Sequence, residues 1–306
     1  MEETNKKVDE TSEHDLEPRR MSTVGFRGLL KTLLKNRLSV IGIVVIILMF
    51  SLALFAPLLA PYDPNEPDYY NLLKGPSAKH WLGTDDLGRD LLSRIIYGAQ
   101  VSMTVGLGCT VFSLMFGTFM GVLSGYRGGA WDMVIMRICD MIFIFPGFMF
   151  ILIMAAALGP GMINIIIAIS LFGWAGPARL VRGNVLAVRE MPYVEAARAA
   201  GASNTRIMFK YVLPNCLAPM IVAAALGLGA AVGMEAGAAF LGIGVQPPTP
   251  SWGRELRVGY TYLSTVPLYS VAPGLMITMA IMAFIALGDG LRDALDPRLR
   301  GEGKKV

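Results

Sequence analysis

Charged residues are scarce in this chain. Asp, Glu, Lys and Arg make up 16% of its 306 residues, and 54% are hydrophobic, whereas a typical soluble domain carries about 25% charged residues. So little charge cannot cover the surface of a globule of this size. The hydrophobic residues also gather in long uncharged runs, and a run of roughly 18 or more is typical of a membrane-spanning helix. The composition therefore predicts an all-α membrane protein.

Metal-binding and redox motifs are also missing. The chain has two histidines, His14 and His80, which lie far apart in the sequence. Its three cysteines, Cys109, Cys139 and Cys216, lie in apolar runs and show no C-x-x-C spacing. Metal sites of these residue types need several ligands close together. We therefore expect no metal site and interpret the cysteines as small apolar residues.

Motifs for catalysis are absent as well. No nucleotide-binding loop of the form G-x-x-x-x-G-K-[ST] occurs, since Gly301-Glu302-Gly303-Lys304 lacks that spacing. Neither H-E-x-x-H nor the G-x-S-x-G nucleophile elbow is present. We therefore expect that the chain is not an enzyme and binds no cofactor itself. The net charge of +4 comes with no basic run interleaved with aromatics, so we attribute it to membrane orientation rather than to nucleic acid binding.

The chain begins with a polar stretch over residues 1–22. It carries acidic residues and no short apolar core, so it does not resemble a cleavable signal peptide. We expect a disordered cytoplasmic tail there. Over 23–37, apolar and basic residues alternate at helical spacing, which predicts an amphipathic helix in the membrane interface. The alternative is that these residues form the leading turns of the first span.

Six apolar runs follow between residues 38 and 291 and predict a six-helix transmembrane domain. Tyr126-Arg127-Gly128-Gly129 predicts a turn, and Gly159-Pro160-Gly161 divides a charge-free stretch that is too long for one helix. The predicted spans cover about 38–60, 101–126, 132–158, 162–180, 215–245 and 271–291.

The segments between these spans differ in charge. We expect outer loops over about 61–97 and 246–270, a charged loop over about 186–213, and a charged tail over 292–306. Most of the 27 Lys and Arg residues lie on the side that holds both ends of the chain and the charged loop. The positive-inside rule therefore predicts that both termini and this loop are cytoplasmic.

The charged loop has the local signals of two short helices. Pro192 suits the first turn of a helix, and Glu195 close behind it favours the helix dipole. The Ala-rich turns that follow have high helix propensity and little side-chain bulk. Gly201 permits a sharp change of direction, and Ser203 can cap a second helix over about 204–212. We predict a small helical bracket that could fit a groove on a partner; an ordinary amphipathic connector is the alternative.

This loop resembles the EAA loop of the permease subunits of ATP-binding-cassette (ABC) importers. The pattern is E-A-A, three residues, Gly, nine residues, an apolar residue, any residue and Leu-Pro, with Tyr211 where Ile is more usual. The resemblance implies that the loop docks on a cytoplasmic ATPase and transmits its closure to the spans. The residues that it assigns to docking are Glu195, Ala196, Ala197, Arg198, Gly201, Ser203, Leu213 and Pro214.

Three further segments resemble the C-type permease of dipeptide, oligopeptide and nickel importers. They run from His80 to Arg94, from Phe240 to Gly253, and through the tail motif 296–300. Without the resemblance, the first is a capped turn, and the second is a rigid proline segment whose aromatics suit a membrane-interface belt or contact with a delivery protein. The motif residues of the first outer loop are Gly83, Thr84, Asp85, Gly88, Arg89 and Asp90.

The resemblance implies a type I ABC importer permease fold in the cytoplasmic (inner) membrane. It implies a heterodimer with a homologous second permease, two cytoplasmic ATPase subunits that bind ATP and Mg, and an extracytoplasmic substrate-binding protein. The expected function is a translocation path for di- or oligopeptides, with a nickel or glutathione importer as the alternative. A self-contained ion-coupled transporter is a third candidate, which is weakened because no inverted repeat relates the two halves.

One ionisable residue, Glu235, lies inside the fifth predicted span without a neighbour in sequence to pair with. Gly229, Gly233 and Gly237 recur every four residues there and form a flat face for close helix packing. Glu235 points about 200° away from Gly233 and Gly237. We hypothesise that it faces the translocation path or the partner permease; a protonated, hydrogen-bonded packing residue is the alternative.

Two other patterns in the spans predict packing. Gly117, Gly121 and Gly125 repeat the four-residue spacing in the second span, which favours close contact with another helix. Arg137 and Asp140 are three residues apart in the third span, so they share a helix face and we expect them to pair.

Overall fold

A computed structural model describes residues 26–295, and apart from one isolated bridge between Thr84 and Asp90 its regular structure is helical. This confirms the all-α prediction for that part of the chain. The predicted tail 1–22 and the tail motif 296–300 lie outside the described residues. The first helix is α2 (Phe26–Leu33), which falls inside the predicted interfacial segment.

The first long helix, α3 (Arg37–Leu54), begins at Asn36, whose Oδ1 accepts a hydrogen bond of 3.0 Å from the Leu38 amide. It ends at Phe55, and the short helix α4 (Ala56–Leu59) follows with Pro57 in its first turn. The sequence predicts one span over 38–60. The helix is interrupted because Pro57 has no amide hydrogen to donate to the preceding turn.

Helix α5 (Leu91–Arg127) is 37 residues long and begins earlier than the predicted second span. The Asp90 carboxylate caps it by accepting a hydrogen bond of 2.8 Å from the Ser93 amide. Most of the residues over 91–97 are buried. The predicted outer loop 61–97 therefore ends at Asp90, because the following turns pack into the bundle.

The third predicted span, 132–158, is broken. Helices α6 (Gly129–Ile144) and α7 (Gly147–Leu158) meet at an angle of 94°. Pro146 lies at the break, where its ring cannot continue the helical hydrogen bonds. Helix α8 (Met162–Gly173) then returns after the predicted Gly-Pro-Gly turn, in which the Asn164 side-chain amide donates to the Leu158 carbonyl at 2.9 Å.

The remaining helices form the bracket, the second outer loop and the last two long helices. Helix α9 (Ala175–Arg189) continues α8, so the charged loop begins later than residue 186. Helix α13 lies within the segment predicted as the outer loop 246–270. The other elements are α10 (Pro192–Ala199), α11 (Asn204–Ile207), the π-helix η1 (Met208–Val212), α12 (Leu213–Phe240), α13 (Trp252–Thr261) and α14 (Pro267–Leu295).

Five helical stretches in residues 26–295 are long and apolar enough to cross a membrane, and α6 with α7 would make a sixth if they form one bent span. Large apolar side chains on α3 point outward, with Leu38 68% exposed and Ile47 60% exposed. Such a surface is typical of a helix that faces lipid or another protein. The five stretches are Arg37–Leu54, Leu91–Arg127, Met162–Arg189, Asn204–Phe240 and Pro267–Leu295.

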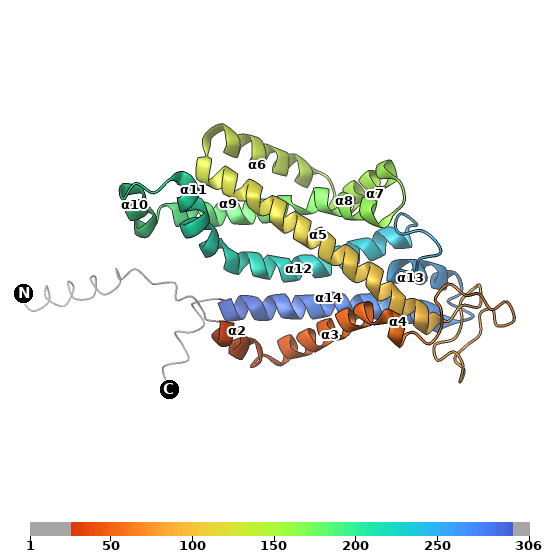
Figure 1. Cartoon of the computed structure of the whole chain (residues 1–306). Coiled ribbons are helices and arrows are strands. Elements are labelled where there is room, and N and C mark those ends of the chain that lie inside the picture. Colours follow the sequence, from red (N-terminus) through yellow and green to blue (C-terminus); the bar gives the residue numbers. More distant parts are fainter. Residues whose placement is uncertain (1–25, 296–306) are drawn as a thin grey trace, which may run out of the picture.

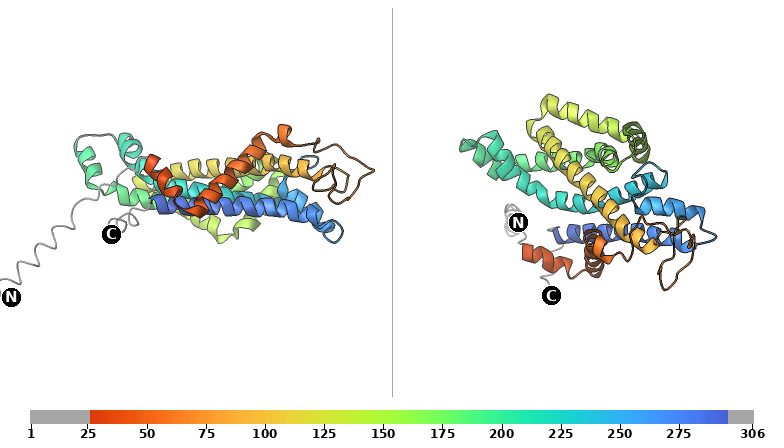
Figure 2. Two further views of the ribbon diagram at one scale, coloured as in Figure 1. Left: turned by 90° about the horizontal axis from the view of Figure 1, so that it is seen from below. Right: turned by 45° about the vertical axis from the view of Figure 1, so that its right-hand side comes forward.

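The long helices run roughly along one axis, and α5 crosses the bundle diagonally (Figure 1). The bracket of α10 and α11 lies at one end, and α4, α13 and the outer loops lie at the other, as Figure 2 also shows. Leu33 of α2 packs against Leu291 and Ala294 of α14. The end of α2 and the end of α14 therefore lie side by side, at the same end of the bundle as the bracket (Figure 1).

Glycine faces bring three pairs of helices close together. A Cβ at Gly121 of α5 would lie 2.5 Å from the Ala178 carbonyl oxygen of α9, and Gly117 and Gly125 also face α9. Gly229 and Gly233 of α12 face α14, and Gly237 faces Phe148 of α7. The predicted packing role of both glycine patterns is confirmed.

Substitution of Gly121 tests the contact between α5 and α9. We expect Gly121→Ala to destabilise the fold by about 1–3 kcal/mol, because the added methyl group overlaps a backbone carbonyl that cannot rotate away. Gly176→Ala on α9 is the matched control, since a Cβ there meets nothing within 4 Å. Thermal unfolding in detergent compares the two; equal melting temperatures would contradict the packing role.

Candidate functional site

The bracket has the shape that the sequence predicts. Pro192 lies in the first turn of α10 together with Glu195. Gly201 has φ of 80°, a left-handed conformation that reverses the chain after α10 and favours glycine. The Ser203 Oγ accepts a hydrogen bond of 3.3 Å from the Arg206 amide and caps α11. Two short helices therefore fold back on one another at the end of the bundle.

The inner side of the bracket is fixed to the long helices. Val194, Ile207 and Val212 are fully buried and pack with Val185 and Val188 of α9. The η1 segment then runs without interruption into α12. The bracket is therefore packed against α9 and continuous with α12.

A polar contact also joins the bracket to α5. The Tyr126 hydroxyl at the end of α5 donates to the Asn204 Oδ1 at 3.0 Å. Tyr126 and Asn204 are 78 residues apart in sequence. The bracket therefore touches the ends of three long helices, α5, α9 and α12.

The outer side of the bracket is open. Of the residues assigned to docking, Ala197 and Leu213 are half-buried, and Pro214 lies in the first turn of α12. The exposed ones are Glu195, Ala196, Arg198, Gly201, Ser203 and Pro214.

Large side chains flank these exposed residues. Tyr193 is 42% exposed, Met191 is 41% exposed and Phe209 is 61% exposed. Aromatic residues and Met are enriched at protein–protein interfaces. These three residues were not predicted from the sequence, although their apolar character in a charged loop is a signal that could have found them. The open side of the bracket therefore combines a carboxylate with apolar anchors.

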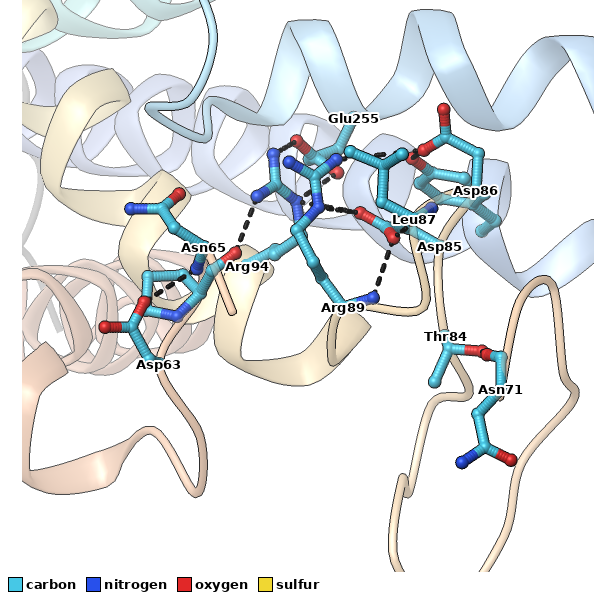
Figure 3. A network of polar contacts seen from close by, with 12 residues as sticks. Asp63, Asn65, Asn71, Thr84, Asp85, Asp86, Leu87, Arg89, Arg94 and Glu255 are labelled. Carbon is cyan, nitrogen blue, oxygen red and sulfur yellow. Dashed lines mark hydrogen bonds and ion pairs between the residues drawn. The ribbon is translucent and has the colours of Figure 1, made fainter. Parts of the chain in front are cut away.

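The motif of the first outer loop lies at the opposite end of the bundle, and its residues are buried. Figure 3 shows its polar contacts. The Thr84 hydroxyl donates to the Asn71 carbonyl at 2.5 Å and accepts from the Lys74 amide at 3.0 Å. The Asp85 carboxylate accepts from the Arg89 amide at 2.8 Å and from Arg89 Nε at 2.6 Å. Gly88 has φ of 78°, and a Cβ there would overlap the Asp68 carbonyl. These residues hold the loop in one conformation.

The centre of this network is a buried ion pair between α5 and α13 (Figure 3). Arg94 Nε and Nη2 donate to the two oxygens of Glu255 at 3.0 and 2.7 Å, and both side chains are 1% exposed. Arg94 Nη1 donates to the Pro64 carbonyl at 2.7 Å, and Arg94 Nε lies 3.4 Å from Asp85. Arg94 thus joins the loop, α5 and α13.

Asp90 extends the same network. Its carboxylate accepts from Ser93 and lies 2.9 Å from His80 Nδ1. The Tyr269 hydroxyl of α14 donates to Asp86 at 3.3 Å. The six motif residues of this loop therefore form a scaffold rather than an open site. Sequence reasoning missed Glu255, which lies 161 residues from Arg94.

Glu235, which was hypothesised to face the translocation path or the partner permease, lies on α12 in the interior of the bundle. Its side chain is completely buried, and the Ser102 hydroxyl of α5 donates to Oε2 at 3.0 Å. Its Oε1 has no hydrogen-bond partner among the described residues. Gly98 and Gly253 let Trp252 and Ala236 approach closely and close off this region. In this structure Glu235 faces neither an open path nor a free surface, and the alternative of a packing residue fits its position.

An apolar cavity of about 370 Å³ lies between α5, α8, α9 and α12. Small residues and hydroxyl groups form much of its lining, including Thr110, Ser113, Gly176 and Gly227. Met234 contributes to the lining, whereas Glu235 does not. The cavity carries no charged side chain.

Ion pairs connect α6 to α9. Arg182 Nε and Nη2 donate to the Asp132 carboxylate at 2.5 and 2.7 Å. Arg179 Nη2 donates to Asp140 at 2.5 Å, and Arg137 Nη1 lies 3.5 Å from the same carboxylate. The predicted pairing of Arg137 with Asp140 is confirmed, and the structure adds Arg179 as a second partner.

Metal coordination finds no support in the part of the chain that the structure describes. No group of three or more His, Cys, Asp or Glu side chains there is placed to hold a metal ion. Cys109, Cys139 and Cys216 are buried and unpaired with one another.

Comparison with known proteins adds two family matches. Residues 117–301 match the family described as binding-protein-dependent transport system inner membrane component. Residues 26–76 match the N-terminal TM domain of oligopeptide transport permease C.

Individual relatives are similar over most of their length. The dipeptide transport system permease protein DppC of Alkalihalophilus pseudofirmus is 42% identical over 275 residues, which cover 90% of each chain. The glutathione transport system permease protein GsiD of Pectobacterium atrosepticum is 39% identical over 276 residues, which cover 90% of this chain and 92% of that one. GsiD of Escherichia coli O157:H7 is 41% identical over 268 residues, which cover 87% and 88%.

Removal of Glu255 tests the buried ion pair. We expect Glu255→Ala to destabilise the fold by about 3–5 kcal/mol, because it leaves the Arg94 guanidinium buried without its main counter-charge. Glu190→Ala is the control, since Glu190 forms a pair with Arg189 that is largely exposed; such a pair contributes about 0–1 kcal/mol. Yield of folded protein and melting temperature measure both. Equal losses in the two variants would contradict a central role for the pair.

Proposed function

Because this chain belongs to the family of binding-protein-dependent transport system inner membrane components, we propose that it lines the path of an ATP-driven importer and is moved through its bracket. As a member of this family, the chain is an ABC transporter permease subunit with several membrane-spanning helices. The observation that carries the mechanism is the bracket, which is open on one side and packed against α9 and α12 on the other.

The bracket receives the mechanical input in this proposal. A cytoplasmic ATPase subunit takes the exposed side of the bracket, with Glu195 and the flanking Tyr193 and Phe209, into a groove. Closure of two ATPase subunits around ATP and Mg displaces the bracket. Because Val194 and Ile207 are buried against the long helices, the displacement tilts α9 and α12 and switches the path between outward-facing and inward-facing states.

The orientation follows from the same assignment. We place the bracket, both termini and most of the Lys and Arg residues in the cytoplasm, in agreement with the positive-inside rule. The scaffold of the first outer loop and α13 then face the outside, where an extracytoplasmic binding protein delivers the substrate. A second, homologous permease completes the path and covers part of the exposed apolar surface of helices such as α3.

A dipeptide or short peptide is the substrate that we favour, because the relative named for dipeptide transport is 42% identical. Glutathione is the second candidate, because two relatives named for glutathione transport reach 39% and 41% identity. The uncharged cavity between α5, α8, α9 and α12 suits passage of molecules with varied side chains, since Gly residues leave room and hydroxyl groups can hydrogen-bond a peptide backbone.

A self-contained ion-coupled transporter has less support. That function would use Glu235 as its coupling group, and the complete burial of this side chain gives protons or ions no open access in this conformation. The bracket would also have no purpose in a transporter that needs no ATPase.

Coupling through the bracket predicts a specific loss on substitution of Glu195. We expect Glu195→Gln to weaken ATPase docking roughly 10- to 100-fold, the change that corresponds to one lost charge-assisted hydrogen bond. Co-purification of the ATPase and uptake into proteoliposomes should fall together. Asp293→Asn at the end of α14 is the control, because it also removes an exposed carboxylate at this end of the bundle. Normal docking and uptake with Glu195→Gln would refute the coupling role.

Substrate identity can be tested with the complete transporter and its cognate binding protein in proteoliposomes. We expect ATP-dependent uptake of labelled dialanine, and competition by unlabelled dipeptides that exceeds competition by glutathione. Preference for glutathione would replace the first candidate by the second. Uptake of neither compound would refute the proposed substrate class.

A further inference from the structure

A cavity of about 310 Å³ lies where the end of α12 meets α13, at the same end of the bundle as the outer loops (Figure 1). One wall comes from the turn after α12, including Gly242 and Gln246. The other wall comes from one face of α13, with Arg254, Arg257 and Val258. Small-molecule sites have volumes of about 300–1,000 Å³, so the cavity has room for one small group.

Two guanidinium groups line this cavity, and neither forms an ion pair within residues 26–295. Arg254 and Arg257 are three residues apart on α13, so both lie on the same face of the helix. Neither side chain has a hydrogen bond or an ion pair with any other residue in 26–295. Arg254 Nη1 is buried without an acceptor. An unsatisfied buried donor is costly, and the cost is greatest for a charged group.

The nearby carboxylates are already committed elsewhere. Glu255, next to Arg254 in sequence, accepts both of its hydrogen bonds from Arg94. Asp85 accepts from Arg89 and lies close to Arg94. Burial lowers the pKa of Arg254; Glu255 opposes that shift, and the positive charges of Arg94 and Arg89 add to it. Arg254 therefore lies near two other cations, and the nearby Glu255 carboxylate is already paired with Arg94.

The second arginine, Arg257, is exposed, and its guanidinium lies against the backbone at Gly242. Gly242 has φ of 86°, and the Arg257 guanidinium occupies the space that a Cβ at Gly242 would need. The rings of Phe240 of α12 and Tyr260 of α13 contact each other with centroids 6.0 Å apart, and Tyr260 is 63% exposed. The two arginines therefore line a recess between the turn after α12 and one face of α13.

We propose that this cavity binds a carboxylate group of the transported molecule, with Arg254 and Arg257 as its ligands. This inference rests on the proposed function, in which the substrate is a peptide or glutathione, and both carry a free carboxylate. The guanidinium fork matches a carboxylate through two parallel hydrogen bonds. A recess of this size favours the terminal group of a small molecule over the broad surface of a docking protein.

Chemical protection tests the site without transport. The arginine reagent phenylglyoxal is applied to the complete transporter in membranes, and mass spectrometry follows the modification of Arg257. We expect dialanine at about ten times its Kd to slow this modification roughly tenfold, because the unoccupied fraction falls as 1/(1 + [L]/Kd). Dialanine C-terminal amide should give no protection. Modification of Arg127, exposed at the opposite end of α5, should be unchanged by either compound.

Three results of this experiment would overturn the proposal. The first is equal modification of Arg257 with and without dialanine. The second is equal protection by dialanine and by its amide, which would show that the carboxylate is not the group recognised. The third is protection by inorganic phosphate or by the ligand-free binding protein but not by dialanine, which would assign the cavity to another anion or to a docking contact.

Transport by variants provides the second test. We expect Arg257→Gln and Arg254→Gln to raise KM for dialanine uptake roughly 10- to 100-fold, as for loss of a charge-assisted hydrogen bond. Arg257→Lys should fall between these variants and the wild type, because it keeps the charge and loses the fork. Lys79→Gln, which removes an exposed charge from the first outer loop, is the matched control.

The two proposals fail in different ways. If the wild type transports dialanine and the two Gln variants transport it with unchanged KM, the carboxylate site is wrong and the proposed function stands. If the wild type transports no peptide and no glutathione, the proposed function is wrong, and absence of protection by dialanine would then remove the carboxylate site as well.

Discussion

The charge balance around Arg94 holds together the outer end of this molecule. A guanidinium that is 1% exposed needs a compensating anion, and Glu255 supplies one across 161 residues of sequence. The pair positions α13 against α5, and α13 in turn carries Trp252, whose indole donates to the Ile95 carbonyl at 2.9 Å. The first outer loop closes over the same centre through Asp85 and Pro64.

That arrangement also explains why some of the neighbouring arginines are paired with carboxylates and others are not. Arg94 and Arg89 take the available carboxylates, whereas Arg254 and Arg257 on the other face of α13 have none. Helix α13 therefore carries a closed structural pair at Glu255 on one face and an open cationic recess at Arg254 and Arg257 on another. At the opposite end of the bundle the bracket follows a similar division, with a buried apolar side and an exposed side that includes Glu195.

Much of this architecture could be predicted from residue patterns. The long apolar runs, the Gly-Pro-Gly turn, the Gly201 reversal and the Ser203 cap depend on local chemistry, and the structure agrees with them. The break at Pro146 and the early start of α5 were missed, because hydropathy measures composition and not direction or tertiary burial. The partner of Arg94 could not be predicted, since nothing near it in sequence indicates Glu255. The partner of Glu235 could not be predicted for the same reason, because Ser102 lies on α5, 133 residues away in sequence.

Helix α5 is a single element of 37 residues, about 55 Å long at 1.5 Å per residue. One end carries Arg94 in the outer scaffold, and the other carries Tyr126 in contact with the bracket. An unbroken helix is stiff, so the two ends cannot move independently. If binding at the bracket and binding at the other end are coupled through this helix, the coupling free energy is the same in both directions. In an importer, this would let the ATPase sense a loaded entrance before any substrate has crossed.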